Sequence, residues 1–297
     1  MREPAAIRIL PDGRRLHLSD GPIDLILEAD GALSAVRDAY EAAARRFITI
    51  LDELCAELPL LRSRATRFSP EPYGQIARTM AAAVSPYCEQ HFITPMAAVA
   101  GAVAEAVLSE MLRRSDLQRA YVNNGGDIAL HLSAGHVYTL GMMERPDSLA
   151  LFGSIDVSAE SPVRGVATSG WRGRSFSLGI ADAVTVLAET AAQADAAATI
   201  IANAVDLPGH PAVTRIPANE IAADSDLGTI SVTREVGQLS HSEIDQALRN
   251  GVRAAQELCR RNLIHSAALC LQSRVQVVAP TSDFPRFAPP SRRLQHA

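Results

Sequence analysis

The chain of 297 residues is long enough to bury a substantial core, and with 47% hydrophobic but only 4% aromatic residues that core must be aliphatic. A net charge of −5 without any run of Lys or Arg excludes the electrostatic footprint of a nucleic-acid-binding or anionic-membrane-binding surface. The four cysteines lack metal-ligand spacing and the start of the chain lacks a secretory pattern, so we predict reduced thiols in a cytoplasmic protein.

The first third of the chain predicts strands followed by helices. Alternating apolar and polar residues over Ala5–Glu28 predict a hairpin and a third strand. Helical spacing of the apolar residues predicts an amphipathic helix from Leu33 to about Leu58. A connection rich in Pro and Arg follows, and then a short helix over Ile76–Val84.

A helix rich in small residues is expected to begin at Thr94 and Pro95, with Thr94 as its N-cap. Its Ala and Gly residues permit another backbone to approach very closely. The apolar stretch Pro95–Leu108 is interrupted by Glu105, so we expect no membrane span.

The rest of the chain predicts mostly short strands. They are expected at Ala120–Leu132, Val137–Met142, Leu149–Val157, Gly165–Thr168, Ser175–Leu178, Val184–Leu187, Thr229–Val236 and Ala267–Val278. Helices are expected at Thr190–Val205 and Ser242–Leu263, and a disordered tail at 281–297. This order predicts an α+β fold, with residues 1–280 as one domain that has two strand-then-helix halves, approximately 1–115 and 116–280.

The first candidate site segment is an Asn-Asn-Gly-Gly-Asp sequence after a predicted strand. Its two glycines, Gly125 and Gly126, can adopt positive φ and let a ligand lie against the backbone. Three side chains offer hydrogen bonds: Asn123, Asn124 and Asp127. Because Asn-Gly is also the commonest hairpin signal, a plain turn is the competing interpretation.

The second candidate segment ends a predicted strand in hydroxyls, a glycine and two arginines. Phosphate oxygens can be held by three of its groups: Thr168, Ser169 and the Gly170 amide. Arg172 or Arg174 can supply the countercharge. A solvated loop is the competing interpretation.

The third candidate segment lies at a helix start. Thr190 and Gln193 form a predicted capping pair, which puts Asp195 and Thr199 one turn apart on the same helix face. A carboxylate and a hydroxyl at this spacing offer two hard oxygens to Mg²⁺. The competing interpretation is a structural hydrogen bond between Asp195 and Thr199.

Taken in order, these segments resemble the ApbE-like superfamily, whose flavin transferases carry Asn-x-Gly-Gly-Asp, Thr-Ser-Gly and Ala-Asp-x-x-x-Thr motifs. The matching segments here are Asn123–Asp127, Thr168–Gly170 and Ala194–Thr199. The resemblance covers about Pro95–Val205. More narrowly, the chain is similar to the UPF0280 family, through the stretch Cys88–Met96 and the Asn-Asn-Gly-Gly-Asp turn.

The resemblance implies a T-fold-like α+β architecture, with two similar lobes of antiparallel sheet packed with helices and with FAD bound between them. It also implies Mg²⁺ held by Asp195 and Thr199, with Ala100 as the match for a backbone carbonyl donor. The implied reaction transfers FMN to a threonine of a target protein, while the metal and hydrogen-bond donors neutralise charge on the pyrophosphate. No catalytic residue is assigned.

Two positions differ from the transferases. Their Lys-Gly on the small-residue helix is Gly101-Ala102 here, and the segment Ser175–Asp182 lacks the histidine and proline of their His-Ile-x-Asp-Pro motif. Three functions therefore stay open. They are a Mg²⁺-dependent enzyme for a flavin or other nucleotide-like substrate, a non-catalytic or differently specific binder of a nucleotide or pterin, and a structural role as a homo-oligomer built through the Ala/Gly helix.

Overall fold

The computed structural model describes residues 4–143 and 151–279, which fall into two compact units. The first unit comprises Met1–His136, Ser158–Ala167 and Glu189–Ala196. The second comprises Val137–Val157, Thr168–Ala188 and Ala197–Ala297. Segments of the two units therefore alternate along the chain.

The first unit carries most of the helices. Its elements are β1 (Ala6–Ile9), β2 (Leu16–Asp20), β3 (Ile23–Gly31), α1 (Leu33–Ala56), α2 (Leu58–Leu61), α3 (Gln75–Val84), the 3₁₀ turns η1 (Ser85–Tyr87) and η2 (Pro95–Ala98), α4 (Val99–Arg114), β4 (Leu117–Asn124) and β5 (Asp127–Leu132). Strand β8 (Gly165–Ser169) and helix α5 (Ala191–Ala204) begin in this unit.

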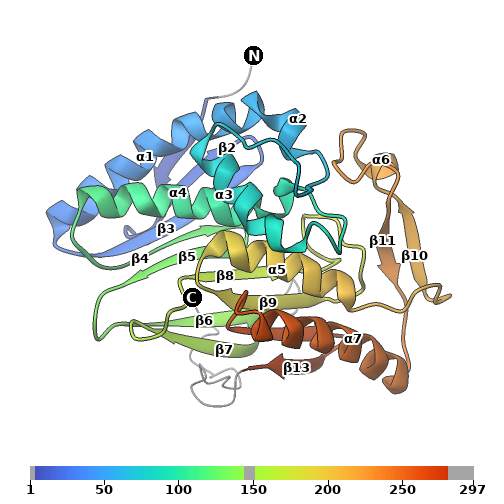
Figure 1. Ribbon diagram of the computed structural model, residues 1–297. Coiled ribbons are helices and arrows are strands. Elements are labelled where there is room, and N and C mark those ends of the chain that lie inside the picture. Colours follow the sequence, from blue (N-terminus) through green and yellow to red (C-terminus); the bar gives the residue numbers. More distant parts are fainter. Residues whose placement is uncertain (1–3, 144–150, 280–297) are drawn as a thin grey trace. The chain divides into compact units, whose positions relative to one another are not determined.

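Antiparallel strands form the sheet of the first unit, in the order β1, β2, β3, β4, β5, and β5 pairs with β8 through Ile128 and Val166. Strand β3 buries alternate residues, Ile23, Leu25 and Leu27, as a sheet with one covered face requires. Helix α1 contacts β2 and β3, and α4 contacts α1, β4 and β5 (Figure 1).

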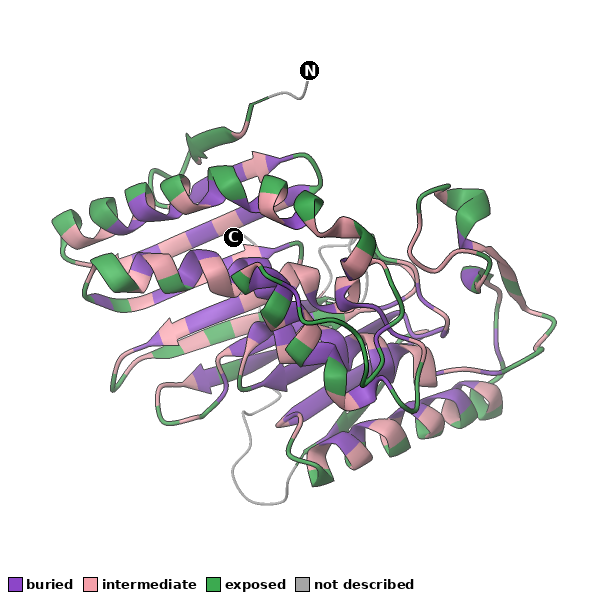
Figure 2. Cartoon of the chain, turned by 45° about the horizontal axis from the view of Figure 1, so that its top comes forward, coloured by how far each residue is buried: buried purple, intermediate pink, exposed green. Residues whose placement is uncertain are grey.

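Helix α1 has one buried side and one exposed side (Figure 2). Its buried residues recur at helical spacing, and they include Ala39, Ala43, Phe47, Ile50 and Leu54. The amphipathic pattern of the sequence thus directs this helix onto the sheet.

The second unit contains two two-stranded sheets and three strands of the larger, nine-stranded sheet. Its elements are β6 (Val137–Met143), β7 (Leu151–Ser158), β9 (Ala183–Ala188), β10 (Val213–Pro217), α6 (Ala218–Ile221), β11 (Ser231–Val236), α7 (His241–Arg260), β12 (Ser266–Leu271) and β13 (Arg274–Val278). Strand β12 pairs antiparallel with β9 and with β13, and α7 contacts β12 and β13. Strands β9 and β12 are buried at every residue, which explains their almost uninterrupted apolar sequences.

The predicted α+β class is confirmed, while several individual elements differ. No strand forms at Ser175–Leu178, and β10 was not expected. The expected strand Ala267–Val278 is two strands, because Gln272 and Ser273 form a turn with φ of 45° and 64°. Leu149, Ala150 and the predicted tail at 281–297 lie outside the described residues. The division into two lobes near residue 115 stays a prediction.

The start of the small-residue helix also differs from the prediction. Thr94 precedes the 3₁₀ turn η2, and its side chain makes no capping hydrogen bond there. By length and composition alone, the 20 residues Pro95–Arg114 are apolar enough to cross a membrane, a test that buried core helices also pass, so the expectation of no membrane span stays a prediction. Half of the most apolar window of this segment is buried within the structure, as in a core helix.

Candidate functional site

The Asn-Asn-Gly-Gly-Asp segment is a tight turn between β4 and β5. Asn124 and Asp127 face each other across the strand pair, which leaves Gly125 and Gly126 as the two turn residues, with φ of 66° and 114°. The Gly126 amide donates to Asn123 Oδ1 at 2.8 Å. The segment is therefore a hairpin turn of the type that requires left-handed residues, and its glycines are explained by local geometry.

The same turn reaches helix α4. Asn124 is buried, and its Nδ2 donates to the carbonyl oxygen of Ala100 at 3.2 Å. In the next residue of α4, the amide of Gly101 donates to Asp195 Oδ2 at 3.0 Å. The first unit thus brings together predicted residues from three places in the sequence, and we call the group Ala100, Gly101, Asn124 and Asp195 the α4–α5 corner.

Asp195 acts as a capping group for α4, although it belongs to α5. The first amides of a helix have no partner within the helix, and a carboxylate there satisfies them and interacts favourably with the helix dipole. Burial raises the pKa of Asp195 well above its usual range, and the nearby carboxylates of Asp127 and Glu105 raise it further. The amides of Gly101 and Ala100 act in the opposite direction.

Glu105 performs the reciprocal function. It lies on α4, and its Oε1 accepts a hydrogen bond from the Ala192 amide in the first turn of α5 at 2.6 Å. Burial raises the pKa of Glu105, while bonds from the Ala192 and Ala191 amides and the Thr190 hydroxyl lower it. Each of the two helices therefore receives its capping carboxylate from the other. Glu105 was predicted only as an interruption of an apolar stretch.

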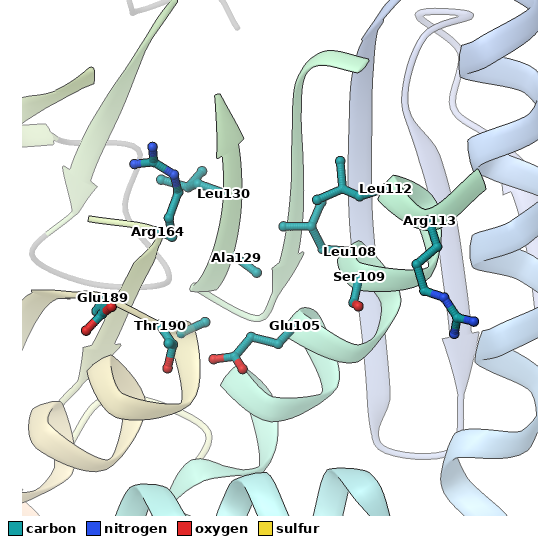
Figure 3. A pocket seen from close by; sticks show the side chains of 11 residues that line it. Glu105, Leu108, Ser109, Leu112, Arg113, Ala129, Leu130, Arg164, Glu189 and Thr190 are labelled. Atoms are coloured by element: carbon teal, nitrogen blue, oxygen red, sulfur yellow. The ribbon is translucent and has the colours of Figure 1, made fainter. Parts of the chain in front are cut away.

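A pocket of about 400 Å³ lies beside Glu105 in the first unit. Figure 3 shows the side chains of Glu105 and Thr190 pointing toward each other at this pocket. Leu108, Leu112 and Leu130 are among its apolar lining residues. Its polar lining residues are two carboxylates, two arginines and two hydroxyls, namely Glu105, Glu189, Arg113, Arg164, Ser109 and Thr190.

Two glycines permit the close approach of α5 to the rest of the first unit. A Cβ atom on Gly101 would lie 2.3 Å from the carbonyl oxygen of Ala191, and one on Gly165 would lie 2.1 Å from the carbonyl carbon of Thr190. Both contacts are with backbone, which cannot move aside as a flexible side chain can. The expectation that small residues of this helix admit another backbone is met at Gly101.

The Thr-Ser-Gly segment belongs to the second unit and is organised by Asp182. This buried carboxylate accepts hydrogen bonds from Arg172 Nε at 2.7 Å and Trp171 Nε1 at 3.1 Å through Oδ1, and from the Gln272 amide at 2.6 Å through Oδ2. The Arg172 guanidinium also stacks over Trp171, 4.2 Å from the ring centroid. We call these four residues the Asp182 cluster.

The other predicted site residues lie on or next to β8 and α5. Thr168 lies on β8, and its Oγ1 is 3.0 Å from Thr185 Oγ1. Ser169 ends β8, and the buried Gly170 follows it. Thr199 lies one turn beyond Asp195 in α5. The expected capping pair is present in part, since the Gln193 amide donates to Thr190 Oγ1 at 3.3 Å.

Asp182 was not among the predicted site residues, although it ends the segment that differs from the flavin transferases. Its only sequence signal is an acidic residue directly before an apolar strand. Within residues 4–143 and 151–279, no three His, Cys, Asp or Glu side chains gather closely enough to hold a metal ion. A metal at the α4–α5 corner would therefore need carbonyl and hydroxyl oxygens in addition to carboxylates.

The chain is similar to a described protein family and to several named proteins. A family model described as AbpE bacteria matches residues 7–277. A UPF0280 protein of Methanopyrus kandleri is 36% identical over 166 residues, covering 56% of this chain and 58% of that protein. A UPF0280 protein of Methanococcus vannielii is 37% identical over 139 residues, covering 46% and 56%. The chain thus spans little more than half the length of these relatives.

A solved structure was also matched. The flavinyl transferase ApbE of Pseudomonas stutzeri, in its apo form, aligns over 94% of this chain and 96% of its own, at 12% identity and a TM-score of 0.36.

Proposed function

The chain belongs to the ApbE-like family described as AbpE bacteria, which includes UPF0280 relatives, and from this membership we propose that it is a Mg²⁺-dependent enzyme that binds a flavin or another nucleotide-like ligand. The observation that carries the proposal is the α4–α5 corner. At the start of α4, the Asp195 carboxylate accepts a hydrogen bond from the Gly101 amide, and the carbonyl of the preceding residue, Ala100, accepts one from Asn124. Asp195 and the Ala100 carbonyl are two of the three metal ligands that the family resemblance implies.

The oxygen donors of this corner suit Mg²⁺, which prefers one or two carboxylates and completes its coordination with other oxygens. Asp195, Thr199 and the Ala100 carbonyl would hold the ion, and when bound it would neutralise charge on a pyrophosphate. The Ala100 carbonyl accepts from Asn124 and, as a first-turn carbonyl of α4, from the helix amide four residues on, so a metal ion there would replace the bond from Asn124. A cation there would also offset the repulsion among the carboxylates of Asp127, Glu105 and Asp195.

The proposed ligand contacts come from the two other motifs. The turn Asn123–Asp127 would place its exposed glycine, Gly125, against the ligand. In the second unit, Thr168, Ser169 and the Gly170 amide would donate to phosphate oxygens. Arg172 can contribute only its terminal nitrogens, because its Nε is engaged by Asp182.

A second candidate function, a non-catalytic or differently specific binder of a nucleotide or pterin, is favoured by one observation. Gly101 replaces the lysine that the flavin transferases carry, and any side chain there would meet the Ala191 carbonyl at 2.3 Å. The close packing of α4 against α5 is thus incompatible with that lysine. The two functions are distinguished by incubating the protein with FAD and Mg²⁺ and analysing the mixture by chromatography. Release of FMN or AMP indicates an enzyme, and intact FAD indicates a binder.

The proposal is tested by thermal unfolding with Mg²⁺ alone and with FAD, FMN, ATP or a reduced pterin. A ligand present at about a hundred times its dissociation constant should stabilise the protein by roughly 2.7 kcal/mol. We expect Asp195→Asn to abolish the Mg²⁺-dependent part of the stabilisation, since the amide still accepts from Gly101 but carries no charge. Asp38→Asn, at an exposed carboxylate of α1, is the control. An unchanged Mg²⁺-dependent shift in Asp195→Asn would contradict the metal site.

A further inference from the structure

A second pocket of the first unit lies between the loop that follows α2 and helix α3. Its volume is about 390 Å³, which is within the range of small-ligand sites. Its polar lining residues include four hydroxyls and two arginines: Ser63, Thr66, Ser69, Ser85, Arg67 and Arg78. We call it the Arg67–Arg78 pocket. Its lining residues are distinct from those of the α4–α5 corner.

Positive charge is concentrated around this pocket. Residues 62–78 contain four arginines and a single acidic residue, Glu71, in a chain whose net charge is −5. Glu57 and Glu89 contact the same segment, so its four guanidinium groups outnumber the neighbouring carboxylates by one, which still opposes the overall charge of the protein. An anion approaching this pocket would meet a potential of opposite sign.

Both lining arginines are available to a ligand. Arg67 is paired only loosely with Glu89, at 3.8 Å, and 69% of each side chain is exposed, so the pair contributes little to stability and can be exchanged. Arg78 is exposed and forms no ion pair within the described part of the chain. The two guanidinium groups thus lie at the pocket without a strong acidic partner.

The loop that carries Arg67 is held in place before any ligand binds. Glu57 accepts hydrogen bonds from the amides of Tyr73 and Gly74, each at 2.7 Å. The Ala65 amide donates to the Ile93 carbonyl at 2.8 Å, and the Thr66 amide donates to Ser69 Oγ at 2.9 Å. These contacts fix both ends of the loop, so ligand binding does not have to order it.

We infer that the Arg67–Arg78 pocket binds the phosphate group of a small phosphorylated ligand. Guanidinium groups donate pairs of hydrogen bonds that match phosphate oxygens, and the Ser85 hydroxyl adds a further donor. The Ser63 hydroxyl already donates to the Pro59 carbonyl, and Thr66 and Ser69 are hydrogen-bonded to each other, so the arginines carry most of the binding. A carboxylate would use fewer of these donors, because it has two oxygens instead of three or four. This inference does not depend on the proposed metal-dependent function.

The test is isothermal titration of the full chain with inorganic phosphate and with pyrophosphate, in buffer containing EDTA. Arg67→Gln/Arg78→Gln should weaken pyrophosphate binding at least about tenfold, since each substitution removes charge-assisted hydrogen bonds. Glu71→Gln should tighten binding about twofold to threefold by removing a like charge from the pocket. Arg37→Gln/Arg45→Gln removes the same two positive charges at exposed sites on α1, and it should leave binding within about twofold.

Three results would overturn the inference. They are no binding of either anion up to about 10 mM, equal effects of the pocket and Arg37/Arg45 variants, and binding that appears only when Mg²⁺ replaces EDTA and is lost in Asp195→Asn. The last result would assign the anion to the α4–α5 corner instead. Thermal unfolding of each variant without ligand shows whether it is folded. The tighter binding expected for Glu71→Gln tests the inference even if Arg67→Gln/Arg78→Gln fails to fold.

Discussion

Buried or half-buried carboxylates organise both the α4–α5 corner of the first unit and the Asp182 cluster of the second, but their partners differ. Asp182 accepts from a guanidinium, an indole and a backbone amide, so its negative charge has a cationic partner in the protein. Asp195 accepts from backbone amides, and the charged groups that act on its pKa, Asp127 and Glu105, are themselves carboxylates.

Asp182 therefore has a structural function with its charge balanced by Arg172, whereas the charge of Asp195 is not balanced by a cation among its named partners. A buried carboxylate paired with Arg172 is complete, and removing it leaves several donors unsatisfied. The carboxylates of Asp195 and Glu105 at helix starts are supported by uncharged donors, namely backbone amides and the Thr190 hydroxyl, so a cation would stabilise them further. The comparison predicts that the Asp182 cluster matters for stability and that the α4–α5 corner matters for cation binding.

The largest expected effect comes from Asp182→Ala. Removal of a buried carboxylate leaves the Arg172 guanidinium, the Trp171 indole and the Gln272 amide without an acceptor, and we expect a loss of about 3 kcal/mol in the free energy of unfolding. Urea unfolding measures the loss. Trp171 is the only tryptophan, so its fluorescence reports the cluster directly in the folded protein.

Asp182→Asn is the matched variant, because it keeps an acceptor oxygen for the indole and should lose less than Asp182→Ala. Equal stability of the wild type and Asp182→Ala would show that the cluster does not hold the loop, and the contrast between the two regions would fail.

The next effect is that of Gly101→Ala at the α4–α5 corner. Alanine favours a helix over glycine by about 1 kcal/mol, but its Cβ would lie 2.3 Å from the Ala191 carbonyl oxygen. Overpacking against backbone costs about 1–3 kcal/mol, and the lost Gly101–Asp195 hydrogen bond adds to it, so we expect a net loss of about 2 kcal/mol. Chemical denaturation measures the change.

Ser109→Ala, on an exposed position of the same helix, should change stability by less than about 0.5 kcal/mol. If Gly101→Ala were as stable as the wild type, α5 would not approach α4 as closely as the structure shows.

The smallest effect is expected for Glu105→Gln, below about 1 kcal/mol at neutral pH, because the amide oxygen still accepts from Ala192. Burial raises the pKa of Glu105, so the folded state holds this proton more tightly than the unfolded state does. The contribution of Glu105 to stability is therefore greatest in acid and falls as pH rises from the unfolded pKa through the folded one.

Glutamine does not titrate, so the stability of the wild type relative to Glu105→Gln should decline as pH rises above the ordinary pKa of a glutamate. Unfolding experiments from acid to neutral pH measure this decline, with Glu41→Gln on the exposed face of α1 as the control. A difference that stays constant with pH would show that Glu105 titrates alike in both states.

Features with a local chemical cause could be predicted from the sequence. The Gly125-Gly126 turn has the residues that a left-handed turn favours, and the α1 helix has a clear apolar periodicity. The turn at Gln272 and Ser273 has neither glycine nor asparagine, so it carries no such signal. It is held by a hydrogen bond to Asp182, 90 residues away in the sequence.

In the candidate site, too, only the features with a local cause could be predicted. Asp195 was found because Asp195 and Thr199 form a recognisable pair on one helix face. The reciprocal caps could not be predicted, because Glu105 and Asp195 act on helices other than their own. Sequence spacing describes neighbours along one helix, whereas these contacts depend on how α4 and α5 pack.

The alternation of the two units along the chain has a consequence for dissecting the protein. Three stretches of each unit follow one another in turn, and β8 and α5 each begin in the first unit and end in the second. No single cut therefore yields either unit as one continuous polypeptide. Fragment expression would have to use permuted or spliced genes, and gain or loss of one unit in evolution would require several coordinated genetic events.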